Sequence, residues 1–199
     1  MTLLIIAACS GTGKSTMARR LLELHTTLRL SVSHTTRAPR PGELDGVAYH
    51  FIDRASFEGR IARRDFVEWA EYAGHLYGTS TREVDDAHRD GCDLLFDVDV
   101  VGAAALKARY SESVSVFILP PSMEVLGDRL RKRGTDDREV VLRRMGVARA
   151  ELAVAHTFDH LIINDVLEDA VREIECVYLS GRSRTSERRL WLQRFGVID

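Results

Sequence analysis

The chain has 199 residues, of which 45% are hydrophobic and 29% are charged, an ordinary composition for a globular protein with one α/β core and small insertions. Its formal net charge at pH 7 is −2, so no overall basic field indicates nucleic acid as a partner. The three cysteines, Cys9, Cys92 and Cys176, are far apart, which argues against a disulfide framework and predicts a cytoplasmic protein. The apolar N-terminal run is too short to span a membrane and lacks the basic flank of a signal peptide, so no membrane partner is expected.

The N-terminal stretch carries the clearest chemical pattern. An apolar run over residues 3–8 predicts a buried central strand, and a glycine-containing turn then leads into a helix. Gly11 and Gly13 allow successive backbone N–H groups to point inward at an anion, and the helix N-terminus adds further donors. Lys14 brings a positive charge to the outer phosphates of a nucleotide, and Ser15 offers a hydroxyl to magnesium. This layout is typical of a phosphate-binding P-loop.

Two other interpretations of this stretch are disfavoured by its residues. A corner that only packs does not require Lys14 and Ser15 at the start of a helix behind two glycines. A dinucleotide-binding loop would need glycine at the position of Thr16 and would not contain a lysine. Ala8 stands where the P-loop motif has its first glycine. This difference puts the tightness of the turn between strand and loop in question, but it leaves the charged group of the motif in place.

Strands and helices alternate along the rest of the chain. Further strands are expected over residues 30–33, 47–52, 66–72, 76–79, 93–100, 113–119 and 160–164. Helices are expected over residues 14–25, 53–63, 80–89, 103–110, 122–133, 137–155 and 167–179. This order predicts a central parallel sheet covered by helices on both faces, with a small β-rich insertion over residues 33–79.

Polar residues follow the expected core strands at their carboxyl ends, where ligands of such sheets bind. Asp97 and Asp99 alternate with apolar residues, so both carboxylates are expected on one face of the strand, beside magnesium or Lys14. Asn164 follows the last core strand. The alternative for the two carboxylates is a solvated strand end.

The insertion carries groups suited to a second phosphate. Arg37 and Arg40 lie three residues apart on a loop with two prolines, and arginine forks match pairs of phosphate oxygens. Tyr49 and Tyr77 offer neutral hydroxyl donors, although each tyrosine alone is more often core packing. Glu68 lies in an apolar and aromatic run, where its carboxylate is suited to accept two N–H bonds from a guanine edge; the alternative is an exposed strand position.

Four arginines bracket the break at Gly134 between two expected helices, namely Arg131, Arg133, Arg143 and Arg144. A helical hairpin with arginines near its hinge is suited to fold over a transferred phosphoryl group, exclude water and stabilise developing charge. For some of these arginines the alternative is a solvated helix face.

The sequence resembles the guanylate kinase family over nearly its whole length. The matching motifs are Ser-Gly-Thr-Gly-Lys-Ser-Thr at 10–16, Ser-Val-Ser-His-Thr-Thr-Arg-Ala-Pro-Arg-Pro-Gly-Glu at 31–43, Asp-Gly-Val-Ala-Tyr-His-Phe at 45–51, Phe-Val-Glu-Trp-Ala-Glu-Tyr at 66–72, Tyr-Gly-Thr at 77–79, Asp-Val-Asp-Val at 97–100, Phe-Ile-Leu-Pro-Pro-Ser at 117–122 and Arg-Gly-Thr-Asp at 133–136. Three positions depart from the family pattern: Ala8, Val101 in place of glutamine, and Leu76 in place of tyrosine.

The resemblance implies a P-loop NTPase fold in three parts and a reaction between ATP and GMP that needs Mg²⁺. It implies a core over residues 1–32, 80–123 and 156–199, a GMP-binding insertion over 33–79 and a lid with adjoining helices over 124–155. ATP and GMP are the expected partners, and the chain is expected to be a monomer or a homodimer.

The resemblance also implies roles for individual positions. Contacts to ATP are implied for Ala8, Cys9, Ser10, Gly11, Thr12, Gly13, Lys14, Ser15, Thr16 and Asn164. Contacts to GMP are implied for Ser33, Arg37, Arg40, Tyr49, Glu68, Tyr77, Thr79 and Asp99. The implied metal-site residues are Ser15 and Asp97, and the implied catalytic residues are Lys14, Arg37, Arg133 and Arg144. Two alternatives remain open: a catalytically silent protein-binding module of this family, and a kinase for another small phosphorylated acceptor.

Overall fold

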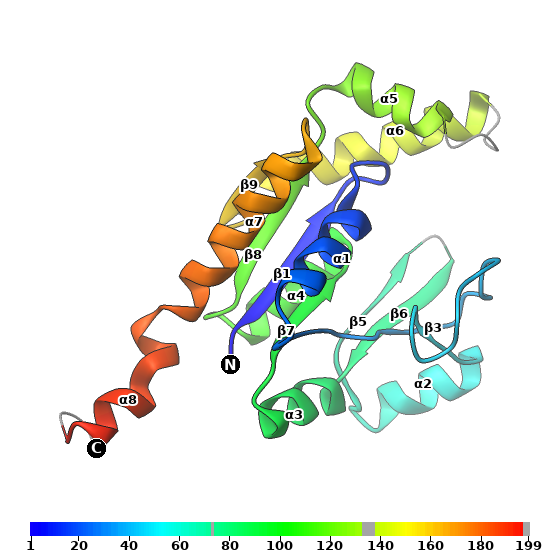
Figure 1. The fold of residues 1–199 in the computed structure, drawn as a ribbon. Coiled ribbons are helices and arrows are strands. Elements are labelled where there is room, and N and C mark those ends of the chain that lie inside the picture. The colour runs from blue at the N-terminus through cyan, green and yellow to red at the C-terminus, as the bar shows by residue number, and fades with distance from the viewer. Residues whose placement is uncertain (73, 133–137, 197–199) are drawn as a thin grey trace.

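The computed structural model describes residues 1–72, 74–132 and 138–196. It contains a five-stranded sheet and a separate four-stranded sheet (Figure 1). The strands of the larger sheet alternate with helices along the chain, whereas the smaller sheet is built from residues 34–80 alone. The fold is therefore an α/β fold with a central parallel sheet, as the sequence predicts.

The larger sheet has the strand order β2-β7-β1-β8-β9, and every neighbouring pair in it is parallel. Its strands are β1 (Leu3–Ala8), β2 (Leu28–Leu30), β7 (Asp93–Asp97), β8 (Val114–Leu119) and β9 (His160–Ile163). All six residues of β1 are buried, which explains why this strand is an uninterrupted apolar run.

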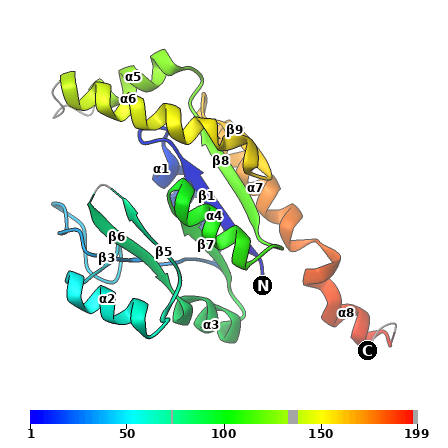
Figure 2. The ribbon, with the colours of Figure 1, turned by 180° about the vertical axis from the view of Figure 1, so that it is seen from behind.

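Helices cover both faces of this sheet. Alternate residues of β1 point to opposite faces, and each set packs against a different group of helices. Leu4, Ile6 and Ala8 belong to a cluster that includes buried residues of α1 (Lys14–Leu24) and α7 (Leu167–Arg182). Leu3, Ile5 and Ala7 belong to the opposite cluster, with residues of α3 (Thr81–Asp90), α4 (Val100–Arg109), α5 (Met123–Lys132) and α6 (Arg138–Ala153). Figures 1 and 2 show these two layers from opposite sides, with α5 and α6 beyond the carboxyl ends of the strands.

The smaller sheet has the order β4-β3-β6-β5 and lies beside the core (Figure 1). Its strands are β3 (His34–Thr35), β4 (His50–Phe51), β5 (Phe66–Tyr72) and β6 (His75–Ser80). Helix α2 (Arg54–Ala62) begins at an Asp53 cap whose carboxylate accepts from the Ser56 N–H at 2.7 Å. Phe57 of this helix is fully buried and stacks on Phe66, which fixes α2 against the sheet.

Three strand predictions differ from the structure. The expected strand over 47–52 is reduced to His50–Phe51, because Val47 and Ala48 donate backward to the Leu44 carbonyl in a local turn. The strand expected over 30–33 is Leu28–Leu30, and the chain then crosses from one sheet to the other. The strand expected over 93–100 ends at Asp97, since Asp99 caps the next helix.

The remaining elements are η1 (Ala155–Thr157), η2 (Thr185–Arg188) and α8 (Arg189–Arg194). The last two extend away from the sheet in both ribbon views (Figures 1 and 2). Among the described residues, no helix combines the length and the apolar character that a membrane crossing requires.

Candidate active site

The loop after β1 is curled by two glycines with positive φ angles, +98° at Gly11 and +94° at Gly13. Within this turn the Thr12 N–H and hydroxyl both donate to the Cys9 carbonyl, at 3.3 and 2.9 Å. Helix α1 follows directly, so its first backbone N–H groups lie next to the turn and favour phosphate oxygens. Ala8 ends β1 and is buried, so the loop curls although it lacks the first motif glycine.

Asn164 holds this loop from the end of β9. Its amide nitrogen donates to the Thr12 carbonyl at 2.6 Å. A Cβ atom on Gly13 would lie 2.5 Å from the same nitrogen, so both the φ angle and this contact require glycine there. The structure thus places Asn164 against the loop backbone, and its contact with ATP stays a prediction.

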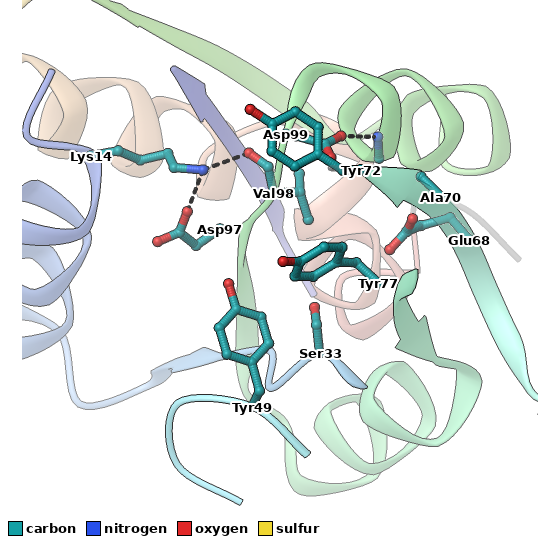
Figure 3. A pocket seen from close by; sticks show the side chains of 11 residues that line it. Lys14, Ser33, Tyr49, Glu68, Ala70, Tyr72, Tyr77, Asp97, Val98 and Asp99 are labelled. Carbon is teal, nitrogen blue, oxygen red and sulfur yellow. Dashed lines mark hydrogen bonds and ion pairs between the residues drawn. The ribbon is translucent and has the colours of Figure 1, made fainter. Parts of the chain in front are cut away.

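Lys14 and Asp97 meet at the carboxyl ends of β1 and β7 (Figure 3), and Ser15 contacts Asp97 there. The Lys14 ammonium lies 2.6 Å from Asp97 Oδ1 and donates to the Val98 carbonyl at 2.6 Å. The Ser15 hydroxyl donates to Asp97 Oδ2 at 3.3 Å. The lysine and both residues of the predicted metal site are therefore brought together.

Arg37 is held by neighbours of its own loop. Its guanidinium donates to both carboxylate oxygens of Glu43, at 2.9 and 2.8 Å, and to the Ala38 carbonyl at 2.7 Å. It also lies over the ring of Tyr49, 5.4 Å from the centroid. Glu43 also accepts from the Arg40 backbone N–H at 2.8 Å, so one carboxylate shapes the loop that carries both arginines.

Glu68 is the buried acid of the smaller sheet, with 7% of its surface exposed. Its Oε1 atom accepts from the Thr79 N–H at 3.1 Å and from the Thr79 hydroxyl at 2.7 Å. The Ser33 hydroxyl lies 3.4 Å from that of Thr79. Burial, aided by the charge of Asp99, raises the pKa of Glu68 above its usual value, although the Thr79 bonds oppose this shift.

Asp99 occupies a helix cap and not a strand face, which corrects the expectation that it shares a sheet face with Asp97. Its Oδ1 atom accepts from the N–H groups of Val101 and Gly102, both at 2.8 Å, at the start of α4. The alternation from Phe96 to Val100 was therefore misleading beyond Asp97. Asp99 nevertheless lies in the same pocket as Glu68 (Figure 3).

Two adjoining cavities bring these residues together, and Ser33, Tyr49, Tyr77 and Asp97 line both of them. The first is lined by Lys14, Ser33, Tyr49, Glu68, Ala70, Tyr72, Tyr77, Asp97, Val98, Asp99 and Gly102. The second is lined by Ser15, Leu30, Ser31, Ser33, Arg37, Arg40, Glu43, Ala48, Tyr49, Tyr77 and Asp97. Ser15 of the lysine loop and Arg37 and Arg40 of the arginine loop therefore line the second cavity together.

The four arginines that bracket Gly134 in the sequence have different surroundings. Arg144 of α6 donates to the Ser10 hydroxyl at 3.2 Å, which places it on the phosphate loop. Arg143 is exposed, and Arg131 is exposed and pairs with Asp128 of its own helix, as expected for solvated helix faces. Arg133 lies outside the described residues, so its predicted role stays a prediction.

Cys9 does not present a reactive thiol to the loop. It is buried, and its thiol donates to the Ala148 carbonyl at 3.4 Å. Burial, together with the nearby charge of Glu151, raises the pKa of this thiol to about 12. Any contribution of Cys9 to ATP binding is therefore expected through its backbone.

The oxygen groups near the loop fit a magnesium ion. Mg²⁺ prefers oxygen ligands and commonly keeps several waters, with one or two carboxylates and substrate phosphates completing its coordination. Ser15 and Asp97 supply a hydroxyl and a carboxylate side by side. Within the described ranges no group of three or more His, Cys, Asp or Glu side chains is placed to hold a metal. The described residues therefore do not supply a complete set of metal ligands by themselves.

Several residues of the cavities have no role in the sequence predictions, and three of them bear on the chemistry of the site. Glu43 clamps Arg37, Tyr72 lines the pocket two residues beyond Ala70, and Gly102 faces Glu68. The position of Tyr72 has a sequence signal, because residues 68, 70 and 72 of one strand share a sheet face. No sequence signal indicates that Gly102 lies close to Glu68, because this contact arises from the packing of α4 against β5.

Gly102 gives a specific prediction for the pocket. A Cβ atom there would lie 3.3 Å from Glu68 Oε2 and 3.3 Å from the Val98 side chain. The family resemblance implies GMP as the ligand of this pocket. We expect Gly102→Ala to raise the KM for GMP on the order of tenfold, because the added methyl group displaces the Glu68 carboxylate. In a helix, alanine is otherwise preferred over glycine by about 1 kcal/mol, so the melting temperature is expected to hold or rise.

Gly146→Ala is the matched control for this substitution. Gly146 lies inside α6, and no atom lies within 4 Å of the Cβ it lacks. Steady-state kinetics and thermal melts of both variants give the comparison. An unchanged acceptor KM in Gly102→Ala would show that the pocket does not need the glycine.

The fold and the cavities define a class of protein. A strand, a glycine loop and a lysine-bearing helix on a parallel sheet are the elements of a P-loop nucleotide-binding protein. The comparisons are more specific. The family model described as guanylate kinase matches residues 1–179, and the chain belongs to the guanylate kinase family.

Individual relatives agree with this assignment. The guanylate kinase of Neisseria gonorrhoeae is 49% identical over 184 residues, which cover 92% of this chain and 90% of that protein. That of Idiomarina loihiensis is 44% identical over 190 residues, which cover 94% of this chain and 90% of that protein. The crystal structure of guanylate kinase from Anaplasma phagocytophilum superposes with a TM-score of 0.80 at 30% identity, covering 100% of this chain and 97% of the other.

Proposed function

We propose that this protein acts as a guanylate kinase and transfers the γ-phosphoryl group of ATP to a phosphate oxygen of GMP. The observation that carries this proposal is the shared space between the two loops. Asp97 forms an ion pair with Lys14, and Ser15 follows Lys14 in the sequence. Both residues line the same cavity as Arg37 and Arg40. A transfer between two nucleotides requires two such anion-binding groups to face each other.

In the proposed mechanism, the residues of the donor side bind the phosphates of ATP. The backbone N–H groups after Gly11 surround the phosphates, and Lys14 adds its positive charge at their outer end. Ser15 and Asp97 would hold Mg²⁺, which would neutralise charge on the phosphates. Arg144 extends from α6 to the same loop, where it stabilises the charge that develops during transfer.

The residues of the acceptor side bind GMP by its phosphate and its base. Arg37, Arg40, Tyr49 and Tyr77 line the cavity in which the phosphate of GMP is placed, with Ser33 beside them. The acceptor oxygen is already anionic, so the mechanism needs no strong general base. Alignment of the two phosphates and neutralisation of their charges supply the rate acceleration.

Guanine is selected by the buried pocket around Glu68. Oε1 of Glu68 is occupied by Thr79, and Oε2 faces Gly102 and the cavity. An ionised Glu68 accepts from the N1–H and N2–H groups of guanine, with Asp99 and Thr79 at the same end of the pocket. Adenine lacks this pair of donors, and a buried carboxylate without them costs several kcal/mol, on the order of a thousandfold in discrimination.

The raised pKa of Glu68 predicts a pH dependence of GMP binding. Because guanine requires the ionised carboxylate, the KM for GMP is expected to rise as the pH falls through this raised pKa, while an ordinary carboxyl is still ionised. The KM for each nucleotide is measured from mildly acidic to neutral pH. Glu68→Gln removes the ionisation of this side chain, whereas the GMP phosphate still ionises. If the KM for GMP depends on pH in the same way in the variant and in the unmodified protein, the assignment is contradicted.

The proposed activity is tested by measuring ADP release with ATP and one acceptor at a time. We expect GMP to be phosphorylated in preference to AMP, CMP and UMP, and dGMP to be accepted as a second guanine nucleotide. No ADP release with any acceptor would favour a silent binding module, and preference for another monophosphate would favour a different kinase. We also propose that residues 33–79 form the GMP-binding insertion and that residues 124–155 form the lid with its adjoining helices.

A further inference from the structure

One face of β5 forms a side of the pocket that contains Glu68. Glu68, Ala70 and Tyr72 alternate along this strand, so their side chains point to the same side, and all three line the first cavity (Figure 3). Tyr77 lies opposite Ala70 on β6 and lines both cavities. Along β5 this face therefore carries a buried acid, a small residue and a large aromatic residue in succession.

The spacing of these residues leaves a slot on β5. Successive residues on one face of a strand lie about 6.6 Å apart, so roughly 13 Å separate the backbone positions of Glu68 and Tyr72. The side chain between them is the methyl group of Ala70, which is buried and fills little of this length. A nucleoside whose base edge meets Glu68 therefore has room to extend over Ala70 towards Tyr72.

Tyr72 is the large side chain at the far end of this slot, and the proposed mechanism does not use it. It is 38% exposed, and Figure 3 shows its ring among the side chains that line the pocket. An aromatic ring that is part of a pocket wall and is open to solvent offers apolar area for a ligand to cover. Small-molecule sites are commonly lined in this way, with a few polar groups that fix the orientation of the ligand.

We propose that Tyr72 is a binding residue for the acceptor nucleotide: its ring covers the nucleoside part of GMP and shields it from water. The contact is apolar and is made by the ring, so it depends neither on the hydroxyl group nor on which purine is bound. Glu68 selects the base, whereas Tyr72 adds affinity without selectivity. This inference rests on the proposed function, because it requires that the pocket around Glu68 holds GMP.

The proposal predicts a change in KM that leaves base selection intact. In Tyr72→Ala, the KM for GMP is expected to rise on the order of tenfold, which is typical of removing an aromatic side chain that a base covers. The kcat is expected to change little, because the lost contact is the same before and during transfer. The ratio of kcat/KM values for GMP and AMP is expected to hold, since both purines lose the same contact. Damage that displaces Glu68 would instead lower this ratio.

Further variants separate the ring from the hydroxyl and from the strand. Tyr72→Phe keeps the ring, so its KM for GMP is expected to stay close to that of the unmodified protein. Tyr72→Thr lacks the ring but has a side chain suited to a strand, so it is expected to match Tyr72→Ala. Trp69→Ala is the matched control, because Trp69 is a large aromatic residue of β5 that is 48% exposed on the opposite face. The control is expected to keep a normal KM for GMP.

Steady-state ADP release with GMP and with AMP, together with thermal melts, is measured for each full-length variant. An unchanged KM for GMP in Tyr72→Ala would overturn the proposal, as would a lowered preference for GMP or an equal rise in KM in Tyr72→Phe or Trp69→Ala. If Tyr72→Ala does not fold, Tyr72→Thr takes its place in the same comparisons. Failure of the unmodified protein to phosphorylate GMP would instead contradict the proposed function, so the two failures are distinguishable.

Discussion

Replacing Lys14 with alanine is expected to lower kcat roughly 10³-fold, a loss typical of removing one group that stabilises transition-state charge. The Lys14 side chain is held between the Asp97 carboxylate and the Val98 carbonyl, each at 2.6 Å, so its ammonium group has a fixed place at the mouth of the phosphate loop. Its loss removes a full positive charge from the donor phosphates. The groups assigned to the acceptor phosphate are on another loop, so the dissociation constant for GMP is expected to stay nearly unchanged.

The measurement combines steady-state ADP release with titration of GMP into Lys14→Ala. Lys107→Ala is a suitable control, since Lys107 pairs with Asp159 at 2.8 Å and lines neither cavity of the active site. The control is expected to retain normal turnover. Near-normal turnover in Lys14→Ala would reject the assignment of this loop to ATP.

Glu68→Gln is expected to remove most of the preference for GMP over AMP. The substitution keeps the size of the side chain, so the pocket retains its shape, but it replaces a carboxylate acceptor with a neutral amide. A hydrogen bond to a charged group contributes about 1.5–3 kcal/mol, so kcat/KM for GMP is expected to fall about 10–100-fold. Adenine leaves that buried carboxylate without its donors, so replacing it with a neutral amide is expected to raise kcat/KM for AMP.

Glu71→Gln provides a matched control on the same strand. Glu71 is exposed and contacts Arg54 at 3.4 Å, on the opposite side of β5 from Glu68. The ratio of kcat/KM values for GMP and AMP is measured in both variants under identical conditions. An unchanged ratio in Glu68→Gln would remove Glu68 from the account of base selection.

Local sequence rules predicted the elements whose causes are local. Residues 3–8 form a buried strand because all six are apolar, and the following loop curls because Gly11 and Gly13 adopt positive φ. The helix expected over residues 53–63 is α2, which begins at the Asp53 cap, and the strands expected over 66–72 and 76–79 form the hairpin of β5 and β6. These predictions are confirmed, as are the parallel sheet and the membership of the guanylate kinase family.

Other features depend on contacts between distant segments, which a single sequence does not reveal. Asp99 follows an alternating pattern that favours a strand, but two N–H groups of α4 use its carboxylate as a cap. The approach of α6 to the phosphate loop joins Ser10 to Arg144 and Cys9 to Ala148, more than a hundred residues apart.

The roles of individual residues stay predictions until substrates are bound. Geometry places Lys14, Ser15 and Asp97 at one end of the site and Arg37 near the other, with Glu43 occupying part of its guanidinium. The phosphate of GMP is therefore expected to use the N–H groups of Arg37 that Glu43 and Ala38 leave free, with Arg40 beside it. A structure with GMP bound would show which N–H groups are used.

The central claim is that one cleft holds two nucleotides with their phosphates facing each other. The most direct measurement is calorimetric titration of a compound in which adenosine and guanosine are joined through their 5′ oxygens by a polyphosphate chain. The account predicts that one molecule binds per chain and that saturating ATP or saturating GMP each displaces it. Displacement by only one nucleotide, or binding of a second molecule to the same chain, would contradict the claim.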